Sequence, residues 1–148
     1  MTLRRTSFVA GMAEPHISKL SALGQDITFD EDQLILPAGE RSTHFYILLS
    51  GSACVEVHTA VYTVCVQVLR PGEAFGWSSL LYRQDTLFQV RARERCTGIC
   101  WDGSQLSAAC REDYEFGLEF LYRVLGVAAL RVKSTESKLA EFCGVSAV

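Results

Sequence analysis

The chain of 148 residues lacks long apolar runs, an excess of basic residues and clusters of cysteine or histidine. Without about 20 consecutive apolar residues it has no predicted transmembrane helix, so we expect no membrane partner. A formal net charge of −3 provides no cationic surface for a phosphate backbone, and direct DNA binding is not expected. The length and the 49% of hydrophobic residues fit one domain around a single core.

The cysteines include no C-x-x-C pair, which argues against a zinc knuckle or a redox dithiol. Cys54 and Cys65 lie in apolar strand-like patterns, where a thiol behaves as a small hydrophobic side chain. Cys96 and Cys100 have no histidine close to them in the sequence, so no metal site is predicted. We expect reduced thiols at all six positions, Cys54, Cys65, Cys96, Cys100, Cys110 and Cys143.

The first residues contain an arginine pair at positions 4–5 followed by a mostly apolar stretch, which resembles a twin-arginine export signal. The apolar stretch ends at Glu14, too early for the hydrophobic region that such a signal needs. We therefore expect residues 1–13 to be a flexible N-terminal arm, residues 14–148 to form the domain, and the protein to be cytoplasmic.

The pattern changes from helix to strands along the chain. Residues 14–24 predict a short amphipathic helix, with proline near its start, glycine at its end and apolar residues at helical spacing. Short runs of β-branched and aromatic residues between turn signals fill residues 26–101, as in a barrel or jelly roll. Alternation is clearest at 54–58 and 61–69, with a hairpin tip at 59–60.

Helices return after this β region. Asp102 or Ser104 can cap a helix that contains residues 106–110, and a longer helix runs from near Asp113 toward Phe142. We therefore predict a mainly β domain with an N-terminal helix and C-terminal helices.

The longer helix carries two apolar faces. Phe116, Phe120, Val124 and Val127 can pack on the barrel, which leaves a second row, with steps of three and four, for a partner helix. We expect this row to form a homodimer; the alternative is that both faces fold onto the barrel. The row, called the seam below, consists of Leu118, Leu121, Leu125, Ala128 and Val132, and continues to Thr135, Leu139 and Phe142.

Four short stretches carry a family resemblance: FYILLSG at 45–51, PGEAFG at 71–76, SLL at 79–81 and VRA at 90–92. In this order, with helices on both sides, they resemble the cyclic-nucleotide-binding domain of cAMP receptor proteins, kinase regulatory subunits and nucleotide-gated channels. The resemblance covers about residues 14–132. It implies a double-stranded β-helix (jelly roll) and a non-catalytic regulatory sensor of a cyclic nucleotide or another phosphorylated ligand.

The chain departs from this family at two charged positions. The family's phosphate-binding cassette reads Phe-Gly-Glu, with a glutamate that accepts a hydrogen bond from the ribose, and the matching residue here is Trp77. The family's phosphate-binding arginine is matched by Thr86, followed by Leu87. Because a charge-assisted hydrogen bond contributes about 1.5–3 kcal/mol, loss of both should weaken cAMP binding by about two to four powers of ten. Ordinary cAMP sensing is not expected.

The loop at 71–81 still suits an anion, because it has glycines and a helix start whose backbone N–H groups lack partners. Arg83 could supply a positive charge, whereas strand alternation turns Arg91 outward. Trp77 could stack on a planar ligand or fill the space of a nucleotide. The predicted ligand residues are Phe75, Gly76, Trp77, Ser78, Ser79, Leu80, Arg83, Thr86 and Leu87.

An enzyme is not expected. Jelly rolls of the cupin type bind a metal through clustered histidines, but His16, His44 and His58 are far apart in the sequence. Ser52 lacks the G-x-S-x-G arrangement of a hydrolase nucleophile. Because the sequence ends at Val148, we expect no DNA-reading domain after the long helix, unless the sequence is a fragment of a longer protein.

Two functions remain open. In the first, the chain is a stand-alone sensor whose occupied pocket reorients the C-terminal helices and thereby alters a protein partner. In the second, it is a ligand-free interaction module in which Trp77 fills the site and the seam forms a homodimer. Apart from the nucleotide or phosphorylated ligand itself, neither function requires a cofactor.

Overall fold

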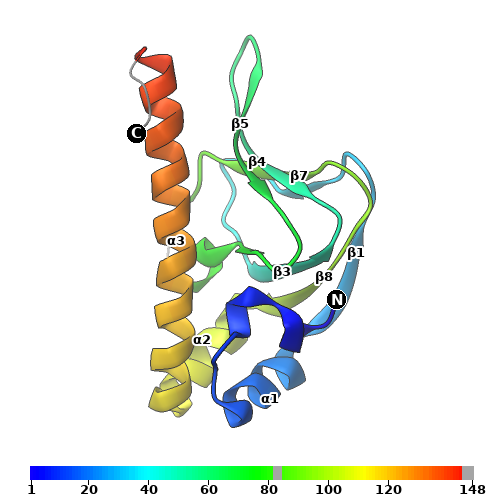
Figure 1. The fold of residues 1–148 in the computed structure, drawn as a ribbon, viewed down its shortest axis with the longest axis vertical. Helices are drawn as coiled ribbons and strands as arrows, with labels where there is room; N and C mark the ends of the chain where they lie inside the picture. Colours follow the sequence, from blue (N-terminus) through cyan, green and yellow to red (C-terminus); the bar gives the residue numbers. More distant parts are fainter. Residues whose placement is uncertain (82–84, 145–148) are drawn as a thin grey trace.

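Two antiparallel four-stranded sheets, in the orders β1-β8-β3-β6 and β2-β7-β4-β5, form the predicted mainly β jelly roll (Figure 1). The computed structural model describes residues 1–81 and 85–144. The strands are β1 (Gln25–Phe29), β2 (Leu34–Leu36), β3 (His44–Ser50), β4 (Ala53–His58), β5 (Thr63–Leu69), β6 (Ala74–Phe75), β7 (Gln89–Ala92) and β8 (Cys96–Asp102). The α-helices are α1 (Glu14–Leu23), α2 (Gly103–Glu112) and α3 (Tyr114–Phe142), and the 3-10 helices are η1 (Leu3–Arg5), η2 (Ser7–Val9) and η3 (Trp77–Leu80).

Local signals set the ends of the helices. α1 has a proline in its first turn and ends before Gly24. The Asp102 carboxylate accepts a hydrogen bond of 3.0 Å from the Gln105 N–H at the start of α2. Asp113 does the same for Phe116 at 3.2 Å at the start of α3. The three α-helices predicted from the sequence are thereby confirmed.

The turn between β4 and β5 is longer than predicted. Its strand β5 begins at Thr63 rather than at residue 61. The reason is the Thr59 hydroxyl, which accepts hydrogen bonds from the N–H groups of Val61 and Tyr62 and so holds them in the turn.

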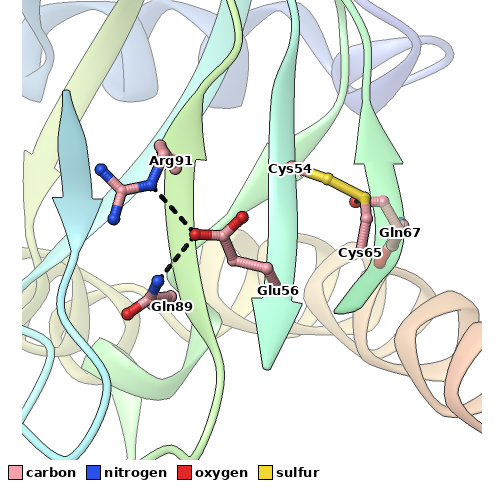
Figure 2. Close-up of a disulfide and its surroundings, with 6 residues drawn as sticks. All are labelled: Cys54, Glu56, Cys65, Gln67, Gln89 and Arg91. Atoms are coloured by element: carbon pink, nitrogen blue, oxygen red, sulfur yellow. Dashed lines mark hydrogen bonds and ion pairs between the residues drawn. A yellow bond between two sulfur atoms is a disulfide. The ribbon is translucent and has the colours of Figure 1, made fainter. Parts of the chain in front are cut away.

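Cys54 and Cys65 form a disulfide between β4 and β5, so the expectation of reduced thiols is wrong for this pair (Figure 2). Their Cα atoms are 5.9 Å apart, within the range for disulfides. A β-bulge between Val55 and Glu56 sets the register that allows this approach, and sequence alternation does not reveal a bulge. The other cysteines, Cys96, Cys100, Cys110 and Cys143, are free thiols.

Residues 1–13, expected to be a flexible arm, are instead packed on the domain. The Phe8 ring lies 5.6 Å from that of Phe45 and 5.8 Å from that of Phe120. Arg123 also donates a hydrogen bond of 2.7 Å to the Phe8 carbonyl oxygen. Because these partners lie far along the chain, local periodicity does not reveal them. The buried residues of this segment are Leu3, Thr6, Phe8, Val9 and Met12.

The hydrophobic core has two parts. One fills the barrel between the sheets and includes Phe29, Val55 and Phe75. The other joins β3 and β8 to the helices and includes Phe45 and Trp101. The predicted barrel-facing residues of α3 belong to this second part: Phe116, Phe120 and Val124 are buried, and Val127 is partly buried.

The seam of α3 stays exposed in the single chain. α3 runs along one side of the barrel and continues past it (Figure 1). Leu118 is 74% exposed, Leu125 64% and Val132 55%, so the two faces do not both fold onto the barrel. Within residues 1–81 and 85–144, no helix has the length and apolarity needed to cross a membrane.

Candidate functional site

A cavity of about 260 Å³ lies between the end of β6, the segment before β7 and the long helix α3. Apolar side chains and hydroxyl groups form most of its wall, together with one carboxylate and one cation. The described residues that line it are Leu36, Gly76, Trp77, Ser78, Asp85, Thr86, Leu87, Phe88, Val90 and Arg131. The cavity therefore lies where the cassette residues were expected to form a site.

Gly76 makes the sharp turn from β6 into η3. Its φ is 78°, and a β-carbon there would lie 2.4 Å from the carbonyl oxygen of His44, so a larger residue does not fit. Ser79 closes the turn, because its N–H and its hydroxyl donate to the Gly76 carbonyl oxygen at 3.0 and 2.7 Å. The Ser79 hydroxyl is thus used within the turn and does not face the cavity.

Five of the predicted ligand residues line the cavity, namely Gly76, Trp77, Ser78, Thr86 and Leu87. Phe75 does not, because its buried ring stacks on Tyr46 with 4.9 Å between the centroids. Leu80 packs against the helical core and faces another hollow, between α2 and α3. In a 3-10 helix, side chains three apart eclipse, so Leu80 follows Trp77 toward that core. Ser79 is placed above, and Arg83 lies outside the described residues.

Trp77 was expected either to stack on a ligand or to fill the space of a nucleotide, and its position combines parts of both interpretations. It is partly buried and packs against the helical core, yet it also lines the cavity. Space of about 260 Å³ remains beside the indole. Opposite it, the Thr86 hydroxyl accepts a hydrogen bond of 3.1 Å from the Phe88 N–H, which fixes the wall before β7.

Five of the described lining residues were not among the predicted ligand residues: Leu36, Asp85, Phe88, Val90 and Arg131. Arg131, from α3, is the cation among them. Its Nε donates to the side-chain oxygen of Gln67 in β5 at 2.8 Å. Burial lowers the pKa of Arg131 to about 10, because desolvation disfavours the charged guanidinium. The sequence does indicate this position, because Arg131 lies four residues after Val127 and continues the stripe of α3 that faces the barrel.

Arg91 does not reach the cavity, as strand alternation predicted. Its Nε lies 3.1 Å from the Glu56 carboxylate, and its Nη1 donates to the Asp32 carbonyl oxygen at 2.8 Å. Gln89 donates to the same Glu56 oxygen at 2.7 Å, so Glu56 connects two residues on the same face of β7 (Figure 2). Arg91 is therefore committed to a cross-strand network.

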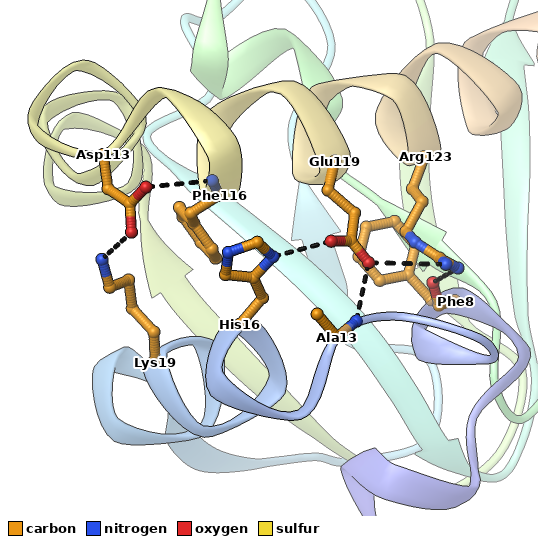
Figure 3. Close-up of polar contacts among 8 residues, drawn as sticks. All are labelled: Phe8, Ala13, His16, Lys19, Asp113, Phe116, Glu119 and Arg123. Atoms are coloured by element: carbon orange, nitrogen blue, oxygen red, sulfur yellow. Dashed lines mark hydrogen bonds and ion pairs between the residues drawn. The ribbon is translucent and has the colours of Figure 1, made fainter.

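The first half of α3 is fastened to α1 and to the N-terminal segment (Figure 3). Lys19 Nζ donates to Asp113 at 2.7 Å, and His16 Nδ1 lies 2.6 Å from Glu119. These hydrogen bonds are the main reason that the pKa values of Asp113 and Glu119 lie below their ordinary values. Arg123 adds its bond to the N-terminal segment.

The second half of α3 is held differently. Among the described residues, one side-chain hydrogen bond joins the helix beyond Val124 to the sheets, the bond between Arg131 and Gln67. Among the described residues, the cavity thus opens beside the half of α3 that has the fewer side-chain hydrogen bonds to the rest of the chain.

Comparisons with known proteins agree with this architecture. The sequence model of the cyclic nucleotide-binding domain matches residues 26–113. A comparison with curated proteins gave no match. Among solved structures, a cyclic nucleotide-binding domain from Methylobacillus flagellatus has a TM-score of 0.79 at 14% identity, over 88% of this chain and 74% of that one. The catabolite activator protein of Thermus thermophilus has a TM-score of 0.74 at 18% identity, over 92% of this chain and 62% of that one.

A third similar structure is the regulatory subunit of a cAMP-independent protein kinase A from Trypanosoma brucei. It is 17% identical with a TM-score of 0.72, and the match covers 95% of this chain and 48% of that one. A mutant of that subunit is bound to cAMP in its A site; in it alanine replaces a glutamate, arginine replaces a threonine, and alanine replaces the valine that follows. At these identities the structures show a shared fold.

None of these structures establishes a ligand for this chain. The sequence match, however, spans more than half of the residues and includes the Gly76 turn and the strands on both sides of it. On this match and the jelly-roll fold, the chain belongs to the cyclic nucleotide-binding domain family.

Proposed function

We propose that the chain is a ligand-sensing regulatory domain, which binds a small anionic molecule beside Gly76 and transmits occupancy through α3. The observation that carries this proposal is the open cavity of about 260 Å³ that remains next to Trp77. α3 supplies part of its wall through Arg131, so a bound ligand touches the helix directly. Such a contact can differ between two positions of the helix, which is the condition for a ligand to shift its equilibrium.

The proposed ligand is not cAMP at the affinity usual for this family. The positions that match the ribose-binding glutamate and the phosphate-binding arginine are Trp77 and Thr86. In the T. brucei subunit, the residues exchanged to arginine and alanine are a threonine and a valine. This chain has the same kinds of residue, Thr86 followed by Leu87, which supports a role independent of cAMP.

A thermal-shift screen tests the proposal. The panel contains cyclic and linear nucleotides and phosphorylated metabolites, and a ligand at 100 times its Kd should stabilise the fold by about 2.7 kcal/mol. That gain corresponds to a rise in Tm of about 5–10 °C for a chain of this size. In Thr86→Trp a large side chain enters the cavity, so the shift should disappear. A panel without any stabilising compound, or an undiminished shift in Thr86→Trp, would argue against this site.

A second function, homodimerisation through α3, is favoured by the exposed seam. Leu118 and Leu125 project from the face of α3 opposite the buried residues, and both are more than half exposed. Leu125→Asp should yield a monomer in light scattering, because a carboxylate in a helix interface is desolvated. The matched control is Leu130→Asp, the same change at an exposed position outside the seam, which should leave a dimer. If Leu125→Asp remains dimeric, the seam is not the interface.

A further inference from the structure

The cavity contains a partly buried cation, Arg131, which forms no ion pair with any described residue, and the family resemblance does not explain it. Of the described residues that line the cavity, Arg131 is the cation and Asp85 the carboxylate. Asp85 is exposed and pairs with Arg41 as an isolated β-bridge through the backbone. The bond of Arg131 goes to the neutral amide of Gln67 instead. A guanidinium that faces a cavity and lacks a counter-ion is a candidate contact for an anion.

The donors of Arg131 are available in the required geometry. A guanidinium has five N–H groups in a planar fork. Gln67 accepts a hydrogen bond from Nε, and none of the described residues accepts one from the four Nη hydrogens. These hydrogens match the paired oxygens of a carboxylate or phosphate group. The side chain is partly buried and therefore partly desolvated, which lowers its pKa, so an arriving oxyanion recovers interaction energy that burial has removed.

We propose that Arg131 recognises the oxyanion group of the ligand, in place of the arginine that is absent at Thr86, and thereby makes α3 part of the binding site. This inference rests on the proposed function of the cavity. The apolar wall formed by Trp77, Leu87 and Phe88 would hold a compact apolar or aromatic body. The volume of about 260 Å³ suits a small organic acid or phosphate ester.

The consequence for the helix follows from its anchors. The first half of α3 is fixed by Asp113, Glu119 and Arg123, whereas the second half depends on the bond from Arg131 to Gln67. The hydrogen bond to Gln67 sets the present orientation of the Arg131 guanidinium. An oxyanion bound to its Nη groups would compete with Gln67 for that orientation. Ligand binding would therefore change how the second half of α3 is held against β5.

NMR titrations with phenyl phosphate, benzoate and neutral benzyl alcohol test the inference on the full chain. In the wild-type protein both anions should shift the Nε–Hε resonance of Arg131 and bind more tightly than benzyl alcohol. Arg131→Gln should lose about tenfold to a hundredfold in affinity for the anions and leave benzyl alcohol unchanged. The control Lys133→Gln removes an exposed cation of α3 that does not line the cavity and should change neither. The ranking of phosphate against carboxylate identifies the preferred oxyanion.

The outcomes separate the two proposals. If Arg131→Gln keeps the anion preference, Arg131 is not the recognition residue and the cavity proposal stands. If benzyl alcohol binds but the anions bind no better, Arg131 is again not the recognition residue, and the cavity binds a ligand without selecting an anion. Binding of none of the three probes would overturn both. If Arg131→Gln does not fold, Arg131→Lys replaces it: loss of the bidentate fork should reduce the preference for the anions, and an unchanged preference would refute the assignment. The Nε–Hε titration needs no variant, and an unshifted resonance at saturating anion also refutes it.

Discussion

Replacing Arg131 by methionine should stabilise the unliganded protein, although it removes a hydrogen bond. Methionine has a long, unbranched and adaptable side chain, so it can follow the same path along the apolar wall. The substitution removes a partly desolvated charge whose bonded partner is the neutral side chain of Gln67. Gln67 is only partly buried, so water can replace the lost donor.

The magnitude follows from the pKa and from the hydrogen bond. In the folded protein the pKa of Arg131 is about 10, roughly 2.5 pH units below its ordinary value, which corresponds to a cost of about 3.4 kcal/mol for the charged form. A hydrogen bond from a charged donor returns about 1.5–3 kcal/mol. Removing both should therefore raise the free energy of unfolding by about 0.5–2 kcal/mol, the direction seen when buried charges are replaced by apolar residues.

Urea unfolding at neutral pH, followed by circular dichroism, measures this change. Arg123→Met is the matched control, because the same substitution removes a cation whose bonds go to the Phe8 carbonyl oxygen and the Glu119 carboxylate. That variant should lose stability by about 1–3 kcal/mol. If Arg131→Met instead lowers the free energy of unfolding by more than about 1 kcal/mol, the charge of Arg131 is well compensated in the unliganded protein. That result would contradict the proposal that Arg131 can bind an anion.

Three further changes have expected outcomes. Trp77→Glu with Thr86→Arg should create cAMP binding in calorimetry, and no heat of binding would mean that the cassette is aligned wrongly or that more contacts are missing. Reducing the Cys54–Cys65 disulfide should lower the free energy of unfolding in urea by about 2–3 kcal/mol, whereas a dithiothreitol effect that persists in Cys54→Ser would have another cause. Below about pH 4, stability should fall, because a hydrogen bond holds the pKa of Asp113 below its unfolded value and the unfolded chain takes up the proton first. Asp113→Asn should show a shallower acid decline in urea titrations, and an equally steep decline would assign it to other groups.

The elements that the sequence predicts correctly are those with local causes. Asp102 and Asp113 cap helices with their own side chains, and the Gly76 turn needs a residue without a β-carbon. The barrel-facing stripe of α3 is predicted because helical period alone places Phe116 and Phe120 on one face.

The elements that were missed have causes at long range. Phe8 is buried by rings from β3 and α3, which no local pattern around residues 1–13 specifies. The disulfide depends on a bulge between Val55 and Glu56. Disulfides persist mainly in oxidising compartments, so the presence of this one argues against the predicted cytoplasmic location.

At the site, the sequence predicts the position of the cavity and the absence of the family's two charged ligand contacts. It does not predict which residue could take the place of the missing arginine. The sequence alone shows that Trp77 and Thr86 occupy the two positions that carry charged residues in the family. Arg131 lies 45 positions after Thr86, and only the packing of α3 against β5 brings it to the cavity. In the sequence, this arrangement is indicated only by a cation, Arg131, on the apolar stripe of the helix, and its role becomes clear once the opposite wall of the cavity is known.

Moving the cation from the cassette to α3 changes how a ligand would act on the helix. An arginine at Thr86 would hold an anion within the barrel, so that α3 could respond only through the loop. Arg131 belongs to the helix itself and lies one residue before Val132 of the seam. If the ligand's bond to Arg131 differs between the monomer and the dimer by about 1.5–3 kcal/mol, its affinity differs between them by about tenfold to a hundredfold. Because such coupling is reciprocal, ligand binding must then shift the monomer–dimer equilibrium by the same factor for each site.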